Sequence, residues 1–370
     1  GMTLPHRTLA NLVAWLGGNG AEPPGRVAQF ASVGFDVSLQ ETFFALANGA
    51  RLVIVDDDTR IEPDRLVRFL AEHRITDLFV PNVVLGYLTE AAVLSDRRLP
   101  ELRNICQAGE ALTVTPHVRD FFRRHPGCRL HNHYGPAESH VVTARTLPAD
   151  PGSWPRDPDI GRPVAKARIY VLDADLRPAP VGVAGELCIG SPGLAFGYLR
   201  DPDLTAARFV PDPHSAEDGA RMYRTGDLAR WRPDGKLDFL GRADFQVKLR
   251  GFRIELGEIE SVIDTIGGIR QSVVVAREDQ PGNQQLVAYL LADGAPDEAA
   301  IRAELATHLP AHMIPSHFVM LEAFPLTPNK KVDRKALPAP AAHKAAARPQ
   351  AAPATAAAPA SQGQASTDTV

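Results

Sequence analysis

The chain alternates strand-like apolar runs with amphipathic helical runs, and this alternation restricts its fold more than any other feature. The apolar run "ARLVIVDD" (50–57) is followed by "EPDRLVRFLAEHR" (62–74) and then by "TDLFVPN" (76–82). Such a succession predicts parallel strands joined by crossover helices, with functional loops at the strand ends. We therefore predict an α/β fold from the first residue to about residue 240.

Two further regions have different patterns of apolar residues. Between 160 and 200 the runs shorten and gain glycine, which predicts a smaller β-rich subdomain. The domains that we predict are a large α/β body that includes this subdomain (1–243), a small mobile C-terminal α+β domain (244–338), and an Ala/Pro-rich linker or tail that is disordered (339–370).

Composition excludes several functional classes. The chain has 370 residues and a formal net charge of −4, and both signs are interspersed, so no basic stripe indicates nucleic acid or an anionic membrane as a partner. Cys106, Cys128 and Cys188 lie far apart without CxxC spacing, which argues against both a zinc site and a disulfide framework. No apolar run has membrane-spanning length and no signal peptide is recognisable, so we expect a cytoplasmic protein.

The stretch "NHYGPAESH" (132–140) is the first candidate site. A Gly-Pro corner cannot continue a helix or a central strand, so its polar neighbours are expected on a loop, where binding residues gather. Taken alone, the stretch is more often a surface turn. His133 and His140 have no Cys or His at metal spacing, so neither is predicted to be a metal ligand.

Seven motifs in a fixed order resemble those of the adenylate-forming enzymes, and most closely the adenylation domains of nonribosomal peptide synthetases. They are "FDVS" (35–38), "NHYGPAE" (132–138), "GELCIGSPGLAFGYL" (185–199), "YRTGDL" (223–228), "GRADFQVKLRGFRIELGEIE" (241–260), "LPAHMIP" (309–315) and "NKKVDRKALP" (329–338). The resemblance implies ATP-dependent activation of an amino acid as its adenylate, with release of pyrophosphate. The acyl group then passes to the phosphopantetheine thiol of a carrier protein.

The resemblance assigns the nucleotide contacts. Around the Gly135 corner it implies that Tyr134 stacks on adenine, that Asn132 contacts the adenine amino group, and that Glu138 holds Mg²⁺. A hard cation needs carboxylate oxygen and a purine needs an aromatic face, which agrees with these residue types. The resemblance also implies that Asp227 and Arg242 contact the ribose, with Arg242 alternatively at a phosphate. On its own, Asp227 is also explained as an acid that stabilises its turn.

Two further residues are assigned in the C-terminal part. Lys331 matches the catalytic lysine of the family, whose ammonium bridges the attacking carboxylate and the α-phosphate. Asp244 stands where related enzymes have the hinge between the large and small domains. Outside the resemblance, Lys331 reads as part of a solvated basic turn and Asp244 as the cap of a loop.

The substrate pocket is also carried over by resemblance. Asp36 matches the acid that pairs with the α-amino group of an amino acid, which separates amino acid activators from acyl or aryl acid activators. The remaining pocket positions are Val37, Gln40, Phe79, Cys106, Ala108, His133, Val141 and Val142. Together with Asp36 and Lys331 they resemble pockets that select proline. The homologue pipecolate differs by one methylene, which discriminates by only about 1–3 kcal/mol.

Departures from the family pattern leave alternatives open. Ala137 replaces a threonine that meets the α-phosphate, Lys330 replaces a glycine, and Phe196 stands where arginine is common. The family's phosphate-binding loop is expected just upstream of "GMTLPHRTLANLVAW", so we expect an N-terminally truncated body. The alternatives are an acyl- or aryl-CoA ligase of the same superfamily and a catalytically impaired binding or scaffold fragment.

Overall fold

The structure is a computed structural model that describes residues 1–18, 24–243, 246–249, 252–280, 283–294, 296–326 and 332–340. The chain forms two compact units, Gly1–Ile259 and Glu260–Val370, each of which is described by itself. The mixed α/β body followed by a smaller C-terminal unit confirms the predicted fold class. The predicted boundary at 244 falls outside the described residues and stays a prediction, as does the tail from 341 onward.

A seven-stranded sheet forms the centre of the first unit within the described residues. Its strands, in spatial order, are β3 (Arg51–Ile54), β2 (Arg26–Gln29), β4 (Asp77–Val80), β5 (Asn104–Gln107), β6 (Arg129–Tyr134), β7 (Thr143–Thr146) and β8 (Arg162–Pro163). The strands from β3 to β6 are parallel, whereas β7 and β8 are antiparallel additions. The predicted parallel strands with crossover connections are therefore present.

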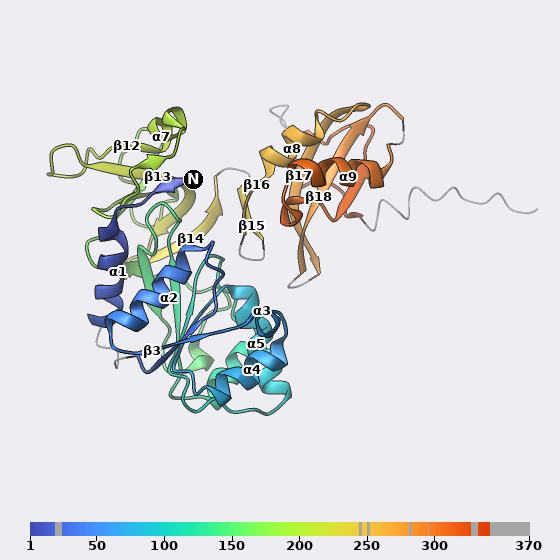
Figure 1. The fold of residues 1–370 in the computed structure, drawn as a ribbon. Coiled ribbons are helices and arrows are strands. Elements are labelled where there is room, and N and C mark those ends of the chain that lie inside the picture. Colours follow the sequence, from blue (N-terminus) through green and yellow to red (C-terminus); the bar gives the residue numbers. More distant parts are fainter. Residues whose placement is uncertain are drawn as a thin grey trace, which may run out of the picture. The chain divides into compact units, whose positions relative to one another are not determined.

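Helices cover both faces of this sheet. They are α1 (His6–Gly18), α2 (Asp36–Ala47), α3 (Asp57–Ile61), α4 (Pro63–Glu72), α5 (Asn82–Leu94) and α6 (Pro116–Arg124). Figure 1 shows α3, α4 and α5 on one side of the sheet and α1 and α2 on the other. Helix α4 begins with a proline at its first turn, which suits a helix start because that position needs no N–H partner. Its buried Leu66, Val67 and Leu70 pack against the sheet in the main core cluster.

The predicted β-rich subdomain is a second sheet of the first unit. Its strands are β9 (Arg168–Leu172), β10 (Gly185–Gly190), β12 (Phe209–Pro211), β13 (Arg221–Trp231) and β14 (Leu237–Arg242), accompanied by α7 (Pro202–Arg208). The short strand β1 (Met2–Thr3) pairs with β11 (Gly197–Tyr198). Strands β15 (Gln246–Leu249) and β16 (Phe252–Glu255) form a hairpin that leads into helix α8 (Leu256–Ile263).

The second unit is the small α+β domain that the sequence predicts. Its three-stranded sheet, within the described residues, has the order β17 (Ile269–Gln280), β18 (Asn283–Ala292) and β19 (His317–Met320), with helix α9 (Glu298–His308). Val287, Tyr289, Val319 and Phe324 lie in its core. Across both units, no helix of the described residues is long and apolar enough to span a membrane.

Candidate active site

Most predicted site residues of the first unit follow the carboxyl ends of its parallel strands. Asp36 opens α2 after β2, Ala108 follows β5, and Tyr134 ends β6. Parallel strands direct their carboxyl ends to the same edge of a sheet, and open α/β sheets bind ligands there. The alternation of strands and helices in the sequence therefore determines which loops can contribute to a common site.

The corner after β6 meets the β-rich subdomain through Tyr134. The hydroxyl of Tyr134 donates a hydrogen bond to Oδ2 of Asp227 over 2.5 Å. Arg242 donates from Nη1 to Oδ1 of the same carboxylate over 2.6 Å, because β13 and β14 pair these two residues in register. Burial, and then the charge of Asp227, raise the pKa of Tyr134 well above its usual value, so its hydroxyl stays protonated and donates. The structure thus joins three of the predicted nucleotide contacts.

Asn132 and Gly135 are held tightly on the same corner. The Asn132 side chain is buried and donates from Nδ2 to the carbonyl of Asp159 over 3.0 Å. Gly135 lies so close to the chain at His140 that a Cβ atom added there would be 1.9 Å from the carbonyl oxygen of His140. Only glycine fits this contact, which explains the residue type at the centre of the motif.

Glu138 is 1% exposed and is oriented by a tyrosine of another motif. The hydroxyl of Tyr198 donates to Oε1 of Glu138 over 2.7 Å and lies 3.2 Å from the hydroxyl of Tyr223. The part of the chain that the structure describes contains no cluster of three or more His, Cys, Asp or Glu side chains able to hold a metal. Mg²⁺ usually takes one or two carboxylates and completes its shell with water and substrate phosphate oxygens, so a single buried, oriented glutamate fits it.

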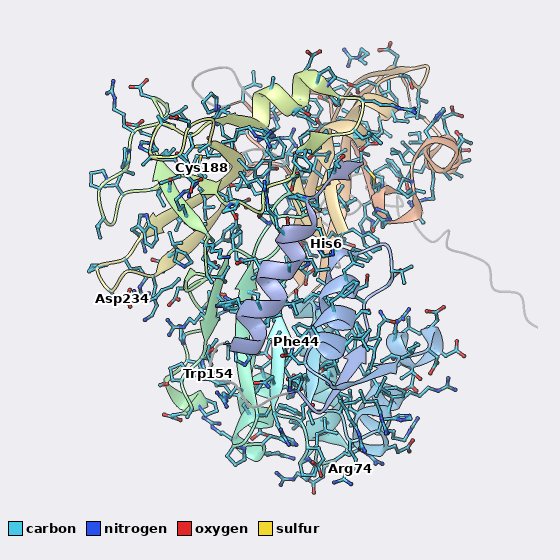
Figure 2. The ribbon with its side chains drawn as sticks, turned by 60° about the vertical axis from the view of Figure 1, so that its left-hand side comes forward. His6, Phe44, Arg74, Trp154, Cys188 and Asp234 are labelled. Carbon is cyan, nitrogen blue, oxygen red and sulfur yellow. The ribbon has the colours of Figure 1, made fainter. Side chains whose placement is uncertain are left out.

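The predicted pocket residues fall into separate groups. Val37, Phe79 and Cys106 share an apolar cluster with Val27 and Phe44, between α2 and the sheet. Burial raises the pKa of the Cys106 thiol well above its usual value, so this thiol behaves as an apolar group. Figure 2 shows Phe44 in the interior of the body. Ala108 continues from β5 and is half-buried.

Val141 and Val142, by contrast, point to other parts of the core. Val141 packs with Leu12 and Val164, whereas Val142 packs in the cluster that contains Tyr134. These two residues border the corner motif and do not join the apolar cluster of Phe79.

Two polar side chains of the predicted pocket are buried without a partner. Nε2 of Gln40 and Nδ1 of His133 have no hydrogen bond within the described residues, although Gln40 is 1% and His133 4% exposed. Burial, followed by the charges of His131 and His140, lowers the pKa of His133 to about 3, so His133 is neutral near pH 7. Buried polar groups are normally hydrogen-bonded, and unpartnered ones need an explanation such as a missing ligand.

Asp36 lies at the first turn of α2, where it is half-buried. Nε2 of His140 lies 3.2 Å from the carbonyl oxygen of Asp36, and Nδ1 accepts from the N–H of Val141 over 3.0 Å. His140 therefore connects the corner after β6 to the start of α2. Asp244 and Lys331 lie outside the described residues, so their predicted roles stay predictions.

The sequence reasoning missed two residues that support this site. Tyr198 lies within a quoted motif, but nothing local indicates that it reaches Glu138. Glu41 is fully buried in α2 next to Gln40, and its carboxylate accepts hydrogen bonds from the backbone N–H groups of Phe30 and Ala31. A glutamate directly before the mainly apolar run "TFFALA" (42–47) was the available signal.

Described residues lie on both sides of Lys331 in the sequence. Leu326 and Val332 form an isolated β-bridge. Farther along, Arg334 donates from Nη2 to Oε1 of Glu260 over 2.8 Å, and the same oxygen accepts from the N–H of Val274 over 2.8 Å. An ion pair therefore joins Arg334 to α8.

The chain is similar in sequence to known proteins. The sequence matches the AMP-binding enzyme family over residues 1–199 and the AMP-binding enzyme C-terminal domain over residues 258–331. Tyrocidine synthase 2 of Brevibacillus parabrevis is 42% identical over 92% of the chain, which covers 9% of that protein. Phosphinothricin tripeptide synthetase of Streptomyces viridochromogenes is 44% identical over 92% of the chain, which covers 29% of that protein. The chain thus spans less than a third of the length of these relatives.

Solved structures agree with the sequence relatives. A nonribosomal peptide synthetase protein that contains adenylation and PCP domains, bound to a vinylsulfonamide inhibitor, superposes with a TM-score of 0.77 at 30% identity, over 90% of this chain and 56% of that one. A four-domain nonribosomal peptide synthetase bound to AMP and glycine gives a TM-score of 0.58 at 36% identity, over 92% of this chain and 25% of that one.

Proposed function

We propose, because this chain belongs to the AMP-binding enzyme family, that it activates an amino acid as its adenylate for nonribosomal peptide synthesis. The observation that carries the proposal is that Tyr134, whose hydroxyl bonds Asp227, stands four residues before the buried Glu138, which Tyr198 orients. An aromatic ring, a carboxylate for a hard cation and a second carboxylate for vicinal hydroxyls are the groups that a magnesium nucleotide requires.

Nucleotide binding at this corner requires an exchange of hydrogen bonds. Both oxygens of Asp227 already accept hydrogen bonds, one from Tyr134 and one from Arg242. Ribose hydroxyls must therefore displace one of these donors or share its oxygen. We propose that the ribose takes the oxygen bonded by Tyr134, since the charged bond to Arg242 is the stronger of the two. Asn132 lies on β6 beside this corner and is proposed to contact the adenine edge.

The proposed reaction is an in-line displacement at the α-phosphorus of ATP. The substrate carboxylate attacks, the bond to the pyrophosphate oxygen breaks, and pyrophosphate leaves with its electron pair. Glu138 is the residue that would hold Mg²⁺, which neutralises phosphate charge when it is bound. Lys331 is proposed to stabilise the charge at the α-phosphate and the attacking carboxylate. Rotation about Asp244 would then remove Lys331 so that a thiol can enter.

The proposed acceptor is a carrier protein with a phosphopantetheine thiol. The thiolate attacks the acyl carbon of the adenylate, AMP leaves, and the acyl group is held as a thioester. The similarity to a chain that contains both adenylation and PCP domains supports this partnership. The reaction consumes ATP, and we propose that it takes place in the cytoplasm.

Proline is the amino acid that we propose as substrate. Val37, Phe79 and Cys106 form a compact apolar group that suits a pyrrolidine ring. The unpartnered Nδ1 of neutral His133 supports a contact with a polar group of the ligand. Asp36 is proposed to pair with the ammonium group, which a fatty acid or an aryl acid lacks.

The test is amino acid-dependent exchange of labelled pyrophosphate into ATP with proline, pipecolate, glycine, benzoate and a fatty acid. We expect the highest exchange with proline, and its loss in Asp36→Ala. Binding of a non-hydrolysable prolyl-adenylate analogue, measured by calorimetry, tests the same pocket without turnover. Exchange with benzoate or the fatty acid that does not depend on Asp36 would favour a CoA ligase. Failure to bind any adenylate analogue would favour a scaffold.

Lys331→Ala separates the two half-reactions. We expect this variant to lose exchange but to keep transfer from a preformed prolyl adenylate to a carrier protein. An equal loss in both reactions would contradict the assignment of Lys331.

A further inference from the structure

Strand β3 forms one edge of the seven-stranded sheet within the described residues. It pairs only with β2 there, since the N–H groups of Arg51 and Val55 donate to the carbonyls of Gly25 and Gln29. Backbone groups of a strand alternate in direction, so the N–H and C=O groups of Leu52 and Ile54 face away from β2. These outward groups can pair with an added strand.

Strand β3 exposes both an apolar and a charged side chain at this edge. Ile54 is 70% exposed, and Arg51 is exposed without an ion pair to any described residue. Val53 packs toward the cluster that contains α4, whereas Leu52 packs toward the cluster that contains α2. The alternation of a strand therefore places Arg51 with Val53 on the α4 side and Ile54 with Leu52 on the α2 side.

Arginines gather at the amino ends of the parallel strands, which is the end opposite the candidate active site. Arg51 lies directly beside Arg26 in the register of β3 and β2. A hydrogen bond from Arg74, aided by its charge and by those of Arg103 and Arg26, lowers the pKa of Glu101. The three residues Arg26, Arg51 and Arg74 are called the arginine edge. Figure 2 shows Arg74 at the lower end of the body.

A surface hollow runs along β3 beside the arginine edge. Its volume is about 580 Å³, and residues 51–54, Arg26 and residues 72–74 line it. Arg26 donates to the carbonyl of His73 over 3.3 Å, so the end of α4 forms the wall of the hollow. Glu72 lines the hollow and Glu101 pairs with Arg74 over 2.8 Å, so three arginines stand beside two glutamates, which leaves an excess of positive charge.

We propose that β3 and the arginine edge bind an extended acidic segment of a partner protein, which adds to the sheet as a further strand. The partner backbone pairs with the outward groups of Leu52 and Ile54, as in other cases of strand addition. Alternate side chains of an extended segment lie on one face, so carboxylates at every second position meet the arginine edge. Apolar side chains at the positions between them cover Ile54. The segment thus alternates acidic and apolar residues.

The rival explanation is that Arg51 only protects an exposed sheet edge from association, since charged residues commonly have that role. The two explanations differ in whether a peptide of the stated pattern binds. They also differ in whether binding needs backbone pairing as well as charge.

The test is fluorescence anisotropy with the full chain and a fluorescein-labelled hexapeptide of alternating glutamate and valine. We expect saturable binding that weakens as salt increases. Two control peptides are a lysine–valine hexapeptide, which reverses the charge, and the glutamate peptide with its central valine replaced by proline, which removes a backbone donor. Both are expected to bind at least about tenfold more weakly.

Variants of the chain locate the site. Arg51→Glu reverses a charge of the arginine edge. Ile54→Pro removes an outward N–H without touching a bond to β2, and proline is tolerated at such edge positions. We expect each to weaken peptide binding at least about tenfold. Arg177→Glu, a matched charge reversal at a side chain that is 75% exposed on the β-rich subdomain, should stay within about twofold. Circular dichroism melting verifies that each variant is folded.

The absence of saturable peptide binding would overturn the proposal, as would full binding by both Arg51→Glu and Ile54→Pro. Binding of a short single-stranded DNA in place of the peptide would also overturn it and assign the arginine edge to nucleic acid.

Discussion

The hydroxyl of Tyr134 donates a hydrogen bond to Asp227, which lies 93 residues later in the chain, over 2.5 Å. This bond joins the sheet of the body to the β-rich subdomain at the candidate nucleotide site. It also holds the carboxylate that is proposed to receive the ribose. The Tyr134 hydroxyl is therefore expected to stabilise the folded chain and to compete with the ribose for Asp227.

Tyr134→Phe separates the effect of the hydroxyl from that of the ring, because it keeps the ring and removes the hydroxyl. We expect the free energy of unfolding to fall by about 1–3 kcal/mol, since a buried carboxylate oxygen loses a donor. AMP affinity should remain within about twofold or increase, whereas Tyr134→Ala should lower it by about 1–3 kcal/mol through lost stacking.

Urea unfolding and calorimetry with AMP measure the two effects. Tyr170→Phe is the control, since Tyr170 makes a similar bond of 3.1 Å to Asp212 in the β-rich subdomain. Loss of AMP affinity in Tyr134→Phe comparable to that in Tyr134→Ala would contradict the proposed exchange.

Tyr198→Phe should weaken metal binding without direct contact between Tyr198 and the ion. Removal of the hydroxyl releases Oε1 of Glu138 from its 2.7 Å bond. Loss of a hydrogen bond that orients a metal-binding carboxylate commonly lowers metal affinity by about 10–100-fold, and we expect the lower part of this range. Electron paramagnetic resonance of Mn²⁺ in the presence of ATP measures the affinity. Tyr87→Phe removes a tyrosine hydroxyl that bonds Arg60, far from the site, and should leave Mn²⁺ binding unchanged.

Glu41 should make the free energy of unfolding fall as the pH rises. Burial raises the pKa of Glu41 from 4.5 to about 8, although the N–H groups of Ala31, Phe30 and Gln29 oppose the shift. The folded state therefore binds the proton more tightly than the unfolded state. Its contribution to stability is complete below pH 4.5 and is lost as the pH rises toward 8.

Glu41→Gln removes this titration. We expect the free energy of unfolding of the wild type to fall relative to the variant between about pH 5 and 8, with a slope of at most about 1.4 kcal/mol per pH unit. Urea unfolding across this range measures both curves. Glu62→Gln changes a surface glutamate that is 42% exposed and serves as the control. Parallel curves for wild type and Glu41→Gln would show that Glu41 does not titrate in this range.

Gln40→Met should stabilise the free chain and weaken substrate binding. The substitution removes a buried amide nitrogen that has no partner among the described residues. An unsatisfied buried polar group costs about 1–3 kcal/mol, so stability should rise by up to that amount. Affinity for a prolyl-adenylate analogue should fall, whereas affinity for AMP should not change. Equal affinity of the wild type and of Gln40→Met for the analogue would exclude Gln40 from the pocket.

The sequence predicted the architecture through local patterns. The run that became α4 carries its apolar residues at helical spacing, and β3 and β4 are short apolar runs on either side of it, so the α/β order followed. The motif around Gly135 predicted a corner, and the structure provides one.

Contacts between distant segments could not be read from the sequence. Tyr198 reaches Glu138 across 60 residues, and neither residue signals the other locally. The arginines of the arginine edge lie far apart in the sequence, and the parallel register of β2 and β3 brings Arg51 beside Arg26. The burial of Glu41 likewise depends on how α2 packs against the turn after β2.

The tight approach of Gly135 to the carbonyl oxygen of His140 has a consequence for protein engineering. A Cβ atom at this position would lie 1.9 Å from that oxygen, so a chain that carries any larger residue must rearrange the corner. Libraries that randomise residues 132–140 to alter selectivity would thus contain many misfolded members unless codon 135 is kept constant. Diversity is better introduced at the other positions of this stretch.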